Sequence, residues 1–198
     1  MTTAKTLLEL AGADLRPPPP DQSCLVLIDL QNEYRAGPIA VTGVDAAVAR
    51  AARLLARARE RGVPVFHIAH LGRAGGMFDP DGERGRIIGA VAPAAGEAVI
   101  GKTLPNAFAG TDLAARLAAT GRTDVVVAGF MTHMCVSSTA RAALDLGFRA
   151  TVDAAACASR DLPDGRGGSI DARTVHEVAL AELADRFAIV VRDGDMPW

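Results

Sequence analysis

Aromatic residues are scarce in this chain of 198 residues, with one Trp, one Tyr and six Phe. Cysteine is also rare: three occur, none in CxxC spacing, which excludes a disulfide framework and a thiol-rich zinc site. No apolar run reaches membrane-spanning length, and the first residues lack a signal-peptide pattern. No basic run occurs, and the net charge of -2 argues against a nucleic-acid surface. We therefore expect a cytoplasmic protein whose partners include neither nucleic acid nor membrane.

Alanine and valine dominate what is present, and the apolar fraction of 49% is typical of a compact enzyme-like domain. Residues 1–22 are interpreted as an N-terminal arm, with a short amphipathic helix over 3–11 and an extended spacer at Pro17–Pro20. Residues 23–198 are predicted to form one domain, since the length fits a single core. We expect its tail, with Met196 and Trp198, to be exposed.

Strand and helix patterns alternate through this domain. Apolar runs predict strands over 24–30, 63–69, 98–100, 124–130, 149–156 and 188–191. Apolar residues at helical spacing predict helices over 44–61, 112–119, from beside 135 to 147, and 171–186. This alternation predicts a three-layer α/β/α sandwich with a six-stranded, mostly parallel sheet. The segments 71–96 and RDLPDGRGG lack a period and are interpreted as loops, the longer one functional or mobile.

Three ionisable residues stand at or near the carboxyl ends of predicted strands: Asp29, Lys102 and Cys135. A parallel sheet brings these ends to one edge, where ligands bind. Cys135 comes where a strand becomes a helix, and the N-H groups and dipole of a helix's first turn favour a thiolate and receive an oxyanion. This position predicts a nucleophile, although a small buried hydrophobe is the alternative.

The segments around these residues carry a family resemblance. They read LVLIDLQNEY around Asp29, VIGKTLPNAFAGTDL around Lys102, and VVVAGFMTHMCVSSTARAALDLGF around Cys135. In order, spacing and context they resemble the isochorismatase-like cysteine hydrolase superfamily over residues 23–191. The resemblance implies the isochorismatase-like hydrolase fold and homo-oligomers, dimers or tetramers.

The resemblance also implies a mechanism. Asp29 would take the thiol proton, Lys102 would stabilise the thiolate, and Cys135 would attack a carbonyl carbon of a small-molecule substrate to form a thioester. A non-proline cis peptide is implied at Phe130-Met131. The backbone N-H groups of Met131 and Cys135 would form the oxyanion hole.

Departures from particular family members refine the function. Nicotinamidases of this superfamily carry an Asp-x-His metal motif, and none occurs between Leu30 and Val63. We therefore expect no catalytic metal and no cofactor. Cys135 favours cleavage of a C-N bond in an amide, lactam or carbamoyl compound. Two alternatives stay open: vinyl-ether hydrolysis, in which Asp29 protonates the substrate, and a non-catalytic oligomeric or redox-sensing module.

Five residues are candidate substrate contacts because of their places near the expected edge: His70, Phe78, Arg84, Phe108 and Gln31. His70 follows a predicted strand, Phe78 and Arg84 lie in the long loop, and Phe108 follows the segment of Lys102. Alternative interpretations are loop packing for both phenylalanines, solvation for Arg84, and fixation of the active-site turn for Gln31.

Other polar residues have structural interpretations. His67 reads as a satisfied core histidine, and Asp153 as a hydrogen-bonded structural carboxylate. His133 could pair with the cysteine two residues later, although the family pattern opposes this. His176 is expected at the surface of its helix. The two other cysteines, at 24 and 157, are expected to be structural.

Overall fold

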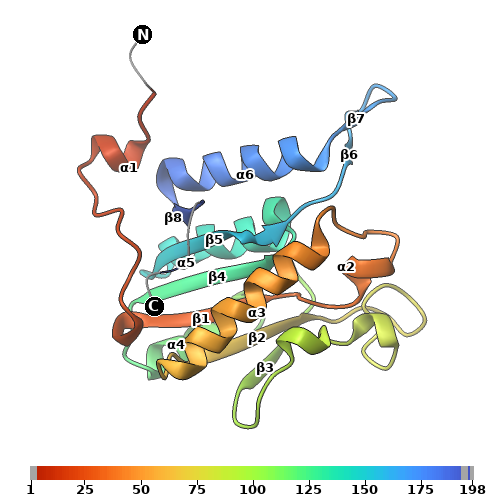
Figure 1. Cartoon of the computed structure of the whole chain (residues 1–198), viewed down its shortest axis with the longest axis horizontal. Coiled ribbons are helices and arrows are strands. Elements are labelled where there is room, and N and C mark those ends of the chain that lie inside the picture. The colour runs from red at the N-terminus through yellow and green to blue at the C-terminus, as the bar shows by residue number, and fades with distance from the viewer. Residues whose placement is uncertain (1–3, 193–195, 197–198) are drawn as a thin grey trace.

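The computed structural model describes residues 4–192 and Met196. A six-stranded sheet with the order β3-β2-β1-β4-β5-β8 forms its centre, and every neighbouring pair of strands is parallel (Figure 1). The strands are β1 (Ser23–Ile28), β2 (Val65–His70), β3 (Ala98–Lys102), β4 (Asp124–Phe130), β5 (Arg149–Ala158) and β8 (Ala188–Val191). The predicted three-layer α/β fold is confirmed.

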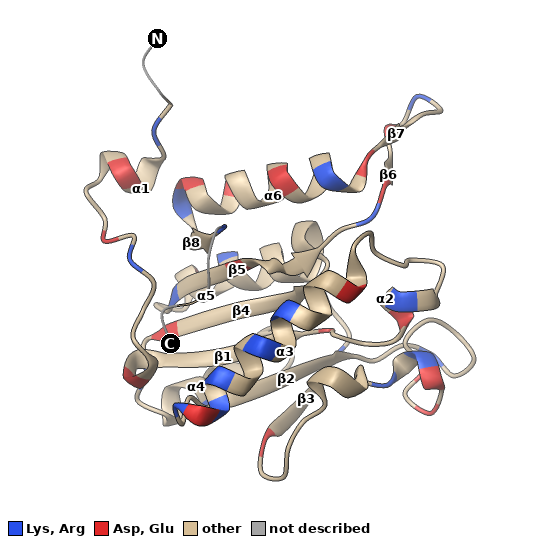
Figure 2. Cartoon of the chain, in the orientation of Figure 1, with Lys and Arg blue, Asp and Glu red and all other residues tan. Residues whose placement is uncertain are grey.

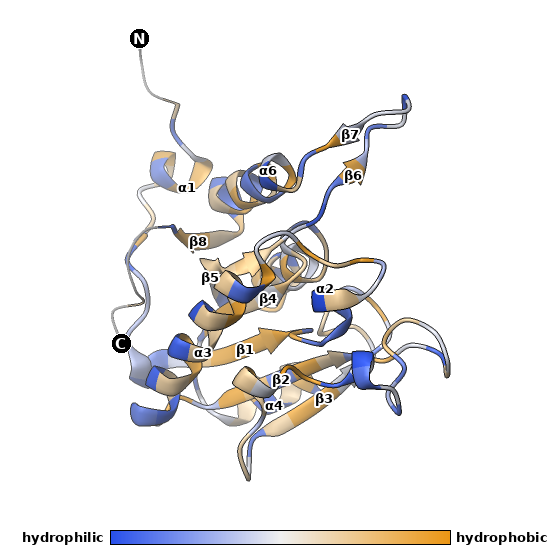
Figure 3. Cartoon of the chain, turned by 45° about the vertical axis from the view of Figure 1, so that its right-hand side comes forward, coloured by the Kyte–Doolittle hydropathy of each residue, from blue (hydrophilic) through white to orange (hydrophobic). Residues whose placement is uncertain are grey.

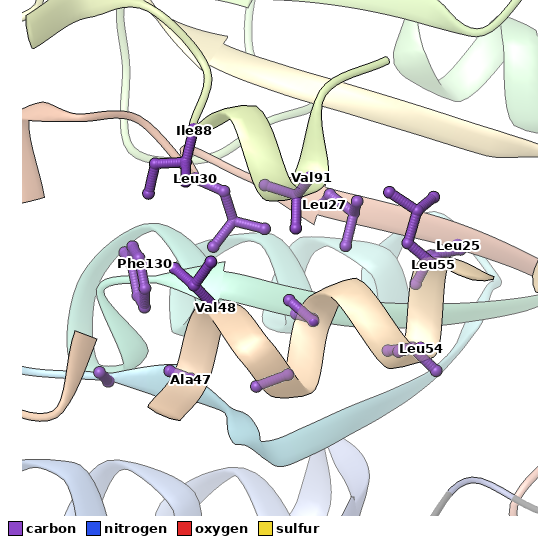
Figure 4. Close-up of a cluster of buried hydrophobic side chains, with 14 of the residues drawn as sticks. Leu25, Leu27, Leu30, Ala47, Val48, Leu54, Leu55, Ile88, Val91 and Phe130 are labelled. Atoms are coloured by element: carbon purple, nitrogen blue, oxygen red, sulfur yellow. The ribbon is translucent and has the colours of Figure 1, made fainter. Parts of the chain in front are cut away.

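Helices cover both faces of this sheet. One face packs against α3 (Val44–Glu60), as the buried side chains in Figure 4 illustrate. The opposite face packs against α4 (Leu113–Ala119), α5 (Ser137–Asp145) and α6 (Ala172–Arg186). Strand β1 contributes side chains to both cores, because alternate side chains of a strand point to opposite faces of the sheet. Leu25 and Leu27 pack on the α3 side, whereas Val26 and Ile28 pack on the opposite side. Burial of each such side chain contributes about 1.5–3 kcal/mol.

Most charged residues lie at the surface, with exceptions such as the buried pair of Arg50 in α3 and Asp153 in β5. Figure 2 shows basic residues following one another along α3. The central strands are hydrophobic over their length, as Figure 3 shows. Among the described helices, none has the length and apolar character needed to cross a membrane.

The N-terminal arm is only partly helical. Its helix α1 covers Leu7–Leu10, shorter than predicted, and begins with a capping box formed by Thr6 and Glu9. The arm is attached to the domain, since the backbone N-H of Leu7 donates to Asp185 Oδ1 of α6 at 2.9 Å. The proline spacer ends in a short 3-10 turn, η1 (Pro20–Gln22).

The loops contain more structure than the sequence indicated. The segment 71–96 includes two 3-10 turns, η2 (Glu83–Gly85) and η3 (Gly89–Val91). The loop after β5 forms a small hairpin, β6 (Leu162–Pro163) with β7 (Ser169–Ile170), which projects from the body in Figure 1. A single turn of helix, α2 (Glu33–Ala36), follows β1.

The expectation of an exposed tail is wrong at Met196. This side chain is 1% exposed and joins the α3-side core, and Arg57 Nη1 donates to its carbonyl at 3.2 Å. Burial of this apolar thioether in the core lowers the free energy relative to its exposure to water. Trp198 lies outside the described residues.

Candidate active site

The strand order places a candidate site between β1 and β4. From β1 the chain proceeds through β2 to β3 on one side, and the second half proceeds from β4 through β5 to β8 on the other. The two halves separate at the carboxyl ends of β1 and β4, and such a switch point is where open parallel sheets bind ligands. Asp29 directly follows β1, and Cys135 follows β4 within five residues.

The backbones of β1 and β4 approach closely at this point. Gly129 has a φ of +129°, and a Cβ there would lie 1.9 Å from the carbonyl oxygen of Ile28. Only glycine fits this contact. The peptide bond between Phe130 and Met131 is cis, at the position that the family resemblance implied.

Asp29 has an unusual backbone conformation. Strand β1 ends at Ile28, two residues before the predicted end at Leu30, so Asp29 lies just after the strand, where it adopts a φ of +49°. Positive φ is uncommon outside glycine and concentrates at functional sites, where surrounding bonds hold it. Here the N-H of Asp29 donates to Ile68 O, and its carbonyl accepts from the N-H of Gln31. The side chain is completely buried.

Lys102 joins the candidate residues. It ends β3, two strands away from β1, and its buried side chain crosses the end of β2. Its Nζ lies 2.6 Å from Asp29 Oδ2, 3.4 Å from Cys135 Sγ and 3.2 Å from His70 Nδ1. An ammonium group has three N-H donors and no acceptor, so each of these three neighbours faces a group that can only donate.

Cys135 lies in a π-helical turn. This turn, η4, spans Thr132–Val136 and precedes α5, so the α-helix begins two residues after Cys135 rather than beside it. The N-H of Val136 donates to Met131 O at 3.2 Å, which closes the wide turn. Cys135 is 3% exposed. The thiol is therefore enclosed with Asp29 and Lys102 before any substrate arrives.

The burial of Cys135 opposes the predicted preference for a resting thiolate. Burial raises the pKa of Cys135 to about 12, and the negative charge of Asp29 raises it too, against the lowering effect of Lys102. Burial also raises the pKa of Asp29 to about 6, opposed by Lys102. The desolvation of a buried thiol outweighs the helix-terminus effect on which the expectation depended. In the resting cluster the thiol form of Cys135 is therefore favoured over the thiolate.

His70 and Phe78 lie next to this cluster. His70 is half-buried, and its ring packs against that of Phe78 with centroids 4.9 Å apart. Burial, and secondarily Lys102, lowers the pKa of His70 to about 4. Phe78 is buried at a φ of +55° and also contacts Tyr34, with ring centroids 5.3 Å apart. Both predicted contacts therefore lie where the long loop meets the cluster.

Gln31 has a structural role in the described contacts. Its Nε2 donates to His70 O at 3.0 Å and Gly85 O at 2.6 Å, and its Oε1 accepts from the N-H of His70 at 2.8 Å. The side chain is 1% exposed. Its amide thus joins the end of β2 to the long loop, as the alternative interpretation proposed, and is not free to bind substrate.

Arg84 and Phe108 are less closely associated with the cluster. Arg84 is half-exposed, and its Nη1 contacts buried Glu33 at 3.3 Å. Phe108 stacks on Phe148, the residue before β5 begins, with ring centroids 6.1 Å apart and planes inclined by 9°. A substrate contact for either residue stays a prediction.

The structure adds residues that sequence reasoning missed. Glu33 is fully buried and accepts from the N-H of Phe78 at 3.2 Å. Arg160 follows β5 at the carboxyl edge, and its Nε is buried with no hydrogen-bond partner in the described part of the chain. An acid directly after Gln-Asn, and an arginine at the start of the loop that follows the predicted strand 149–156, are the sequence signals that could have identified them.

The remaining histidines have polar partners. His133 Nδ1 lies 3.0 Å from Ser159 Oγ, and its Nε2 is buried without a partner among the described residues. His176 is half-buried rather than at the surface, with Nδ1 2.8 Å from Thr132 Oγ1. His67 is satisfied by Glu97 at 2.8 Å.

Asp153 has the structural role predicted for it, since it forms a buried ion pair with Arg50 at 2.8 Å. Cys24 and Cys157 are buried free thiols. Over the described residues, no group of three or more His, Cys, Asp or Glu side chains is arranged to hold a metal ion.

The three-layer α/β fold and the family comparison place this chain among the hydrolases of one family. The family model "Isochorismatase domain" matches residues 23–194, and the chain belongs to the isochorismatase family. It is an isochorismatase-family hydrolase.

Known relatives agree with this assignment. The secreted isochorismatase effector Isc1 of Verticillium dahliae is 35% identical over 88% of this chain and 90% of its own length. Maleamate amidohydrolase of Pseudomonas putida is 37% identical over 65% of this chain and 68% of its own. A solved isochorismatase structure from Pseudomonas putida KT2440 matches with a TM-score of 0.91 and 43% identity, over 96% of this chain and 97% of that one.

Proposed function

We propose that this protein is a cysteine hydrolase that cleaves a C-N bond of a small amide, lactam or carbamoyl compound. One observation carries the proposal: Lys102 Nζ lies 2.6 Å from Asp29 Oδ2 and 3.4 Å from Cys135 Sγ, with all three residues buried. A thiol beside a carboxylate base and a fixed cation is an arrangement for nucleophilic catalysis. The similarity to a protein named maleamate amidohydrolase supports the same bond type.

The first half-reaction begins with a neutral thiol. Asp29 accepts the thiol proton while Sγ of Cys135 forms a bond to the substrate carbonyl carbon. The ammonium of Lys102 stabilises the sulfur as charge develops on it. The carbonyl oxygen becomes an oxyanion, which the N-H groups of Met131 and Cys135 receive. When the C-N bond breaks, Asp29 returns the proton to the leaving nitrogen, and a thioester remains.

The second half-reaction uses water. Asp29 takes a proton from a water molecule whose oxygen attacks the thioester carbon. The C-S bond then breaks, the acid leaves, and Asp29 returns its proton to Sγ of Cys135. In sum, one amide and one water give one acid and one amine, and no oxidant or reductant is needed.

Arg160 favours a substrate that carries an anionic group. Burial, followed by the charges of Asp29 and Cys135, raises the pKa of Tyr34, and the positive charge of Arg160 lowers it. Arg160 therefore acts electrostatically on the same residue as the cluster does. Its Nε and the Nε2 of His133 are both buried without partners among the described residues. Buried polar atoms of this kind cost free energy unless a partner satisfies them. A carboxylate on the acyl portion of the substrate would fit them, and maleamate is an amide of this type.

Ammonia release from a panel of small amides, half of them bearing a carboxylate, tests the reaction. We expect turnover that is lost in Cys135→Ser and in Asp29→Asn, with both variants folded by circular dichroism. Cleavage of a vinyl ether that survives Cys135→Ser but not Asp29→Asn would instead select the vinyl-ether mechanism.

The same panel tests the anionic subsite. Arg160→Gln is expected to raise KM for carboxylate-bearing amides by about tenfold or more, since hydrogen bonds to charged groups contribute about 1.5–3 kcal/mol. Neutral amides of the same size serve as the matched control, and an equal change for both would contradict the subsite.

We also propose a cytoplasmic homo-oligomer, a dimer or tetramer. The three buried free thiols suit a reducing compartment. Leu7 and Leu10 of α1 are 52% and 68% exposed, so the arm offers apolar surface to a second copy. Met196 is buried and offers none. Light scattering that gives a monomer at micromolar concentration would contradict the oligomer.

A further inference from the structure

His70 is the third partner of the catalytic lysine. Lys102 Nζ lies 3.2 Å from its Nδ1, in addition to the contacts with Asp29 and Cys135. An ammonium can only donate, so the imidazole nitrogen that faces it must accept. The imidazole is then neutral and carries its proton on Nε2.

The Nε2 atom of His70 is available to a ligand. No described residue forms a hydrogen bond with it, and it is absent from the buried polar atoms that lack a partner. Since His70 is only half-buried, this donor retains access to solvent at the edge of the cluster. The Nδ1 side of the ring is therefore occupied by the protein, and the Nε2 side is open.

The surroundings of His70 hold the ring in place. Its backbone N-H and carbonyl are both bonded to the Gln31 amide. One side of the ring packs against Phe78, whose own N-H is bound by buried Glu33. These contacts hold His70 from the segment after β1 and from the long loop, which α2 in turn anchors through Glu33. A donor fixed in this way can select a substrate by the position of its acceptor.

We propose that His70 is a further substrate-contacting residue: Lys102 holds it as the neutral Nε2-H tautomer, and Nε2 donates a hydrogen bond to an acceptor oxygen of the substrate beside the scissile bond. The proposal rests on the proposed function for the identity of the substrate as an amide. It adds a requirement, because the group that faces His70 must carry a carbonyl, carboxylate or similar oxygen and not an ammonium. An isolated primary amine at this place would meet a donor and, behind it, the Lys102 cation.

The charged groups around His70 favour the neutral ring. Lys102 from β3 faces Nδ1 directly, and Asp29 and Cys135 contact that lysine rather than the ring. Glu33 and Arg84 pair with each other beyond Phe78. Thus a cation is the group in direct contact with the imidazole, and protonation would place two positive charges next to each other.

Nitrogen-15 NMR of the histidine-labelled protein tests the tautomer without any substrate. The chain has four histidines, so His70→Asn assigns the signal. We expect a neutral Nε2-H ring with no titration from about pH 5.5 to 8, and a pKa nearer the ordinary value of about 6.5 in Lys102→Met. His67, bound to Glu97, is the internal control that should not respond. An Nδ1-H tautomer, or an imidazolium at pH 6 in the unmodified protein, would overturn the proposal.

Kinetics with two conservative variants test the contact with substrate. The amide of His70→Asn can reach Lys102 but leaves no donor at the Nε2 position, whereas the longer His70→Gln keeps a donor there. We expect KM to rise about 3- to 10-fold in His70→Asn, with kcat within about twofold, and to be partly restored in His70→Gln. Equal KM effects in both variants, or a loss confined to kcat, would leave His70 as a support for Lys102 alone and overturn the substrate contact. Activity abolished by Cys135→Ser in the same assay would show that the proposed function still holds in that case.

Discussion

The buried pair of Asp29 and Lys102 allows a quantitative prediction from Lys102→Met. Their side chains are fully buried, with Nζ 2.6 Å from Oδ2. Methionine fills similar space without a charge, so Asp29 would remain buried without its cation. Removing one member of a buried ion pair costs about 3–5 kcal/mol. We expect the free energy of unfolding at neutral pH to fall by about this amount, measured by urea denaturation with an unchanged m-value.

The pH dependence of this loss has a defined sign. Burial already holds the pKa of Asp29 above its ordinary value, at about 6, and without Lys102 it rises further. A carboxyl with a raised folded-state pKa binds protons more tightly in the folded protein, so stability is greatest below the unfolded pKa and falls as pH rises through the folded one. The difference between the two proteins should therefore be smallest near about pH 5 and grow toward about pH 8.

A double variant completes the test. Asp29→Asn combined with Lys102→Met removes both charges and should recover most of the loss, because a neutral pair carries no uncompensated charge. Arg116→Met is the matched control: its pair with Asp112 is half-exposed on α4, and its removal should change stability by less than about 1 kcal/mol. A loss below about 1 kcal/mol in Lys102→Met, or no recovery in the double variant, would refute the reasoning.

Three further predictions address other features of the site. Gly129→Ala should destabilise the fold by several kcal/mol in urea denaturation, since its Cβ would meet Ile28 O at 1.9 Å, whereas Gly89→Ala, with open space around it, should change stability little. The rate kcat/KM should fall on the acid side with an apparent pKa near 6, because Asp29 must be ionised to act as base; an acid limb below pH 4 would contradict this. Iodoacetamide should label Cys135 slowly at neutral pH without substrate, because burial raises the pKa of its thiol to about 12; labelling faster than that of a free cysteine would contradict the neutral resting thiol.

The fold and the three clustered residues were predictable from sequence because each depends on a short-range pattern. Apolar runs and helical periods locate the strands and helices. Because the carboxyl ends of parallel strands lie at one edge of the sheet, Asp29, Lys102 and Cys135 come together there. Packing details depend on contacts between distant segments. The contact of Lys102 with His70 arises because the lysine side chain crosses the end of β2, which no local pattern indicates.

The raised pKa of the Cys135 thiol could not be predicted from the sequence for a related reason. The sequence indicates a helix start, but the extent of burial follows from how η4 folds over the cluster. The role of Gln31 was also hidden, since its partners His70 and Gly85 are 39 and 54 residues away. The long loop has no period of its own, so its attachment to the segment after β1 becomes visible only in three dimensions.

The most direct test of the central claim is the mass of the enzyme during turnover. The protein is mixed with an amide that it hydrolyses, quenched in acid within milliseconds to seconds, and analysed by intact-protein and peptide mass spectrometry. We predict an added mass equal to the acyl group, on the peptide that contains Cys135, and its absence in Cys135→Ser. Continued hydrolysis of the same amide by Cys135→Ser, without any adduct in either protein, would contradict the thioester mechanism.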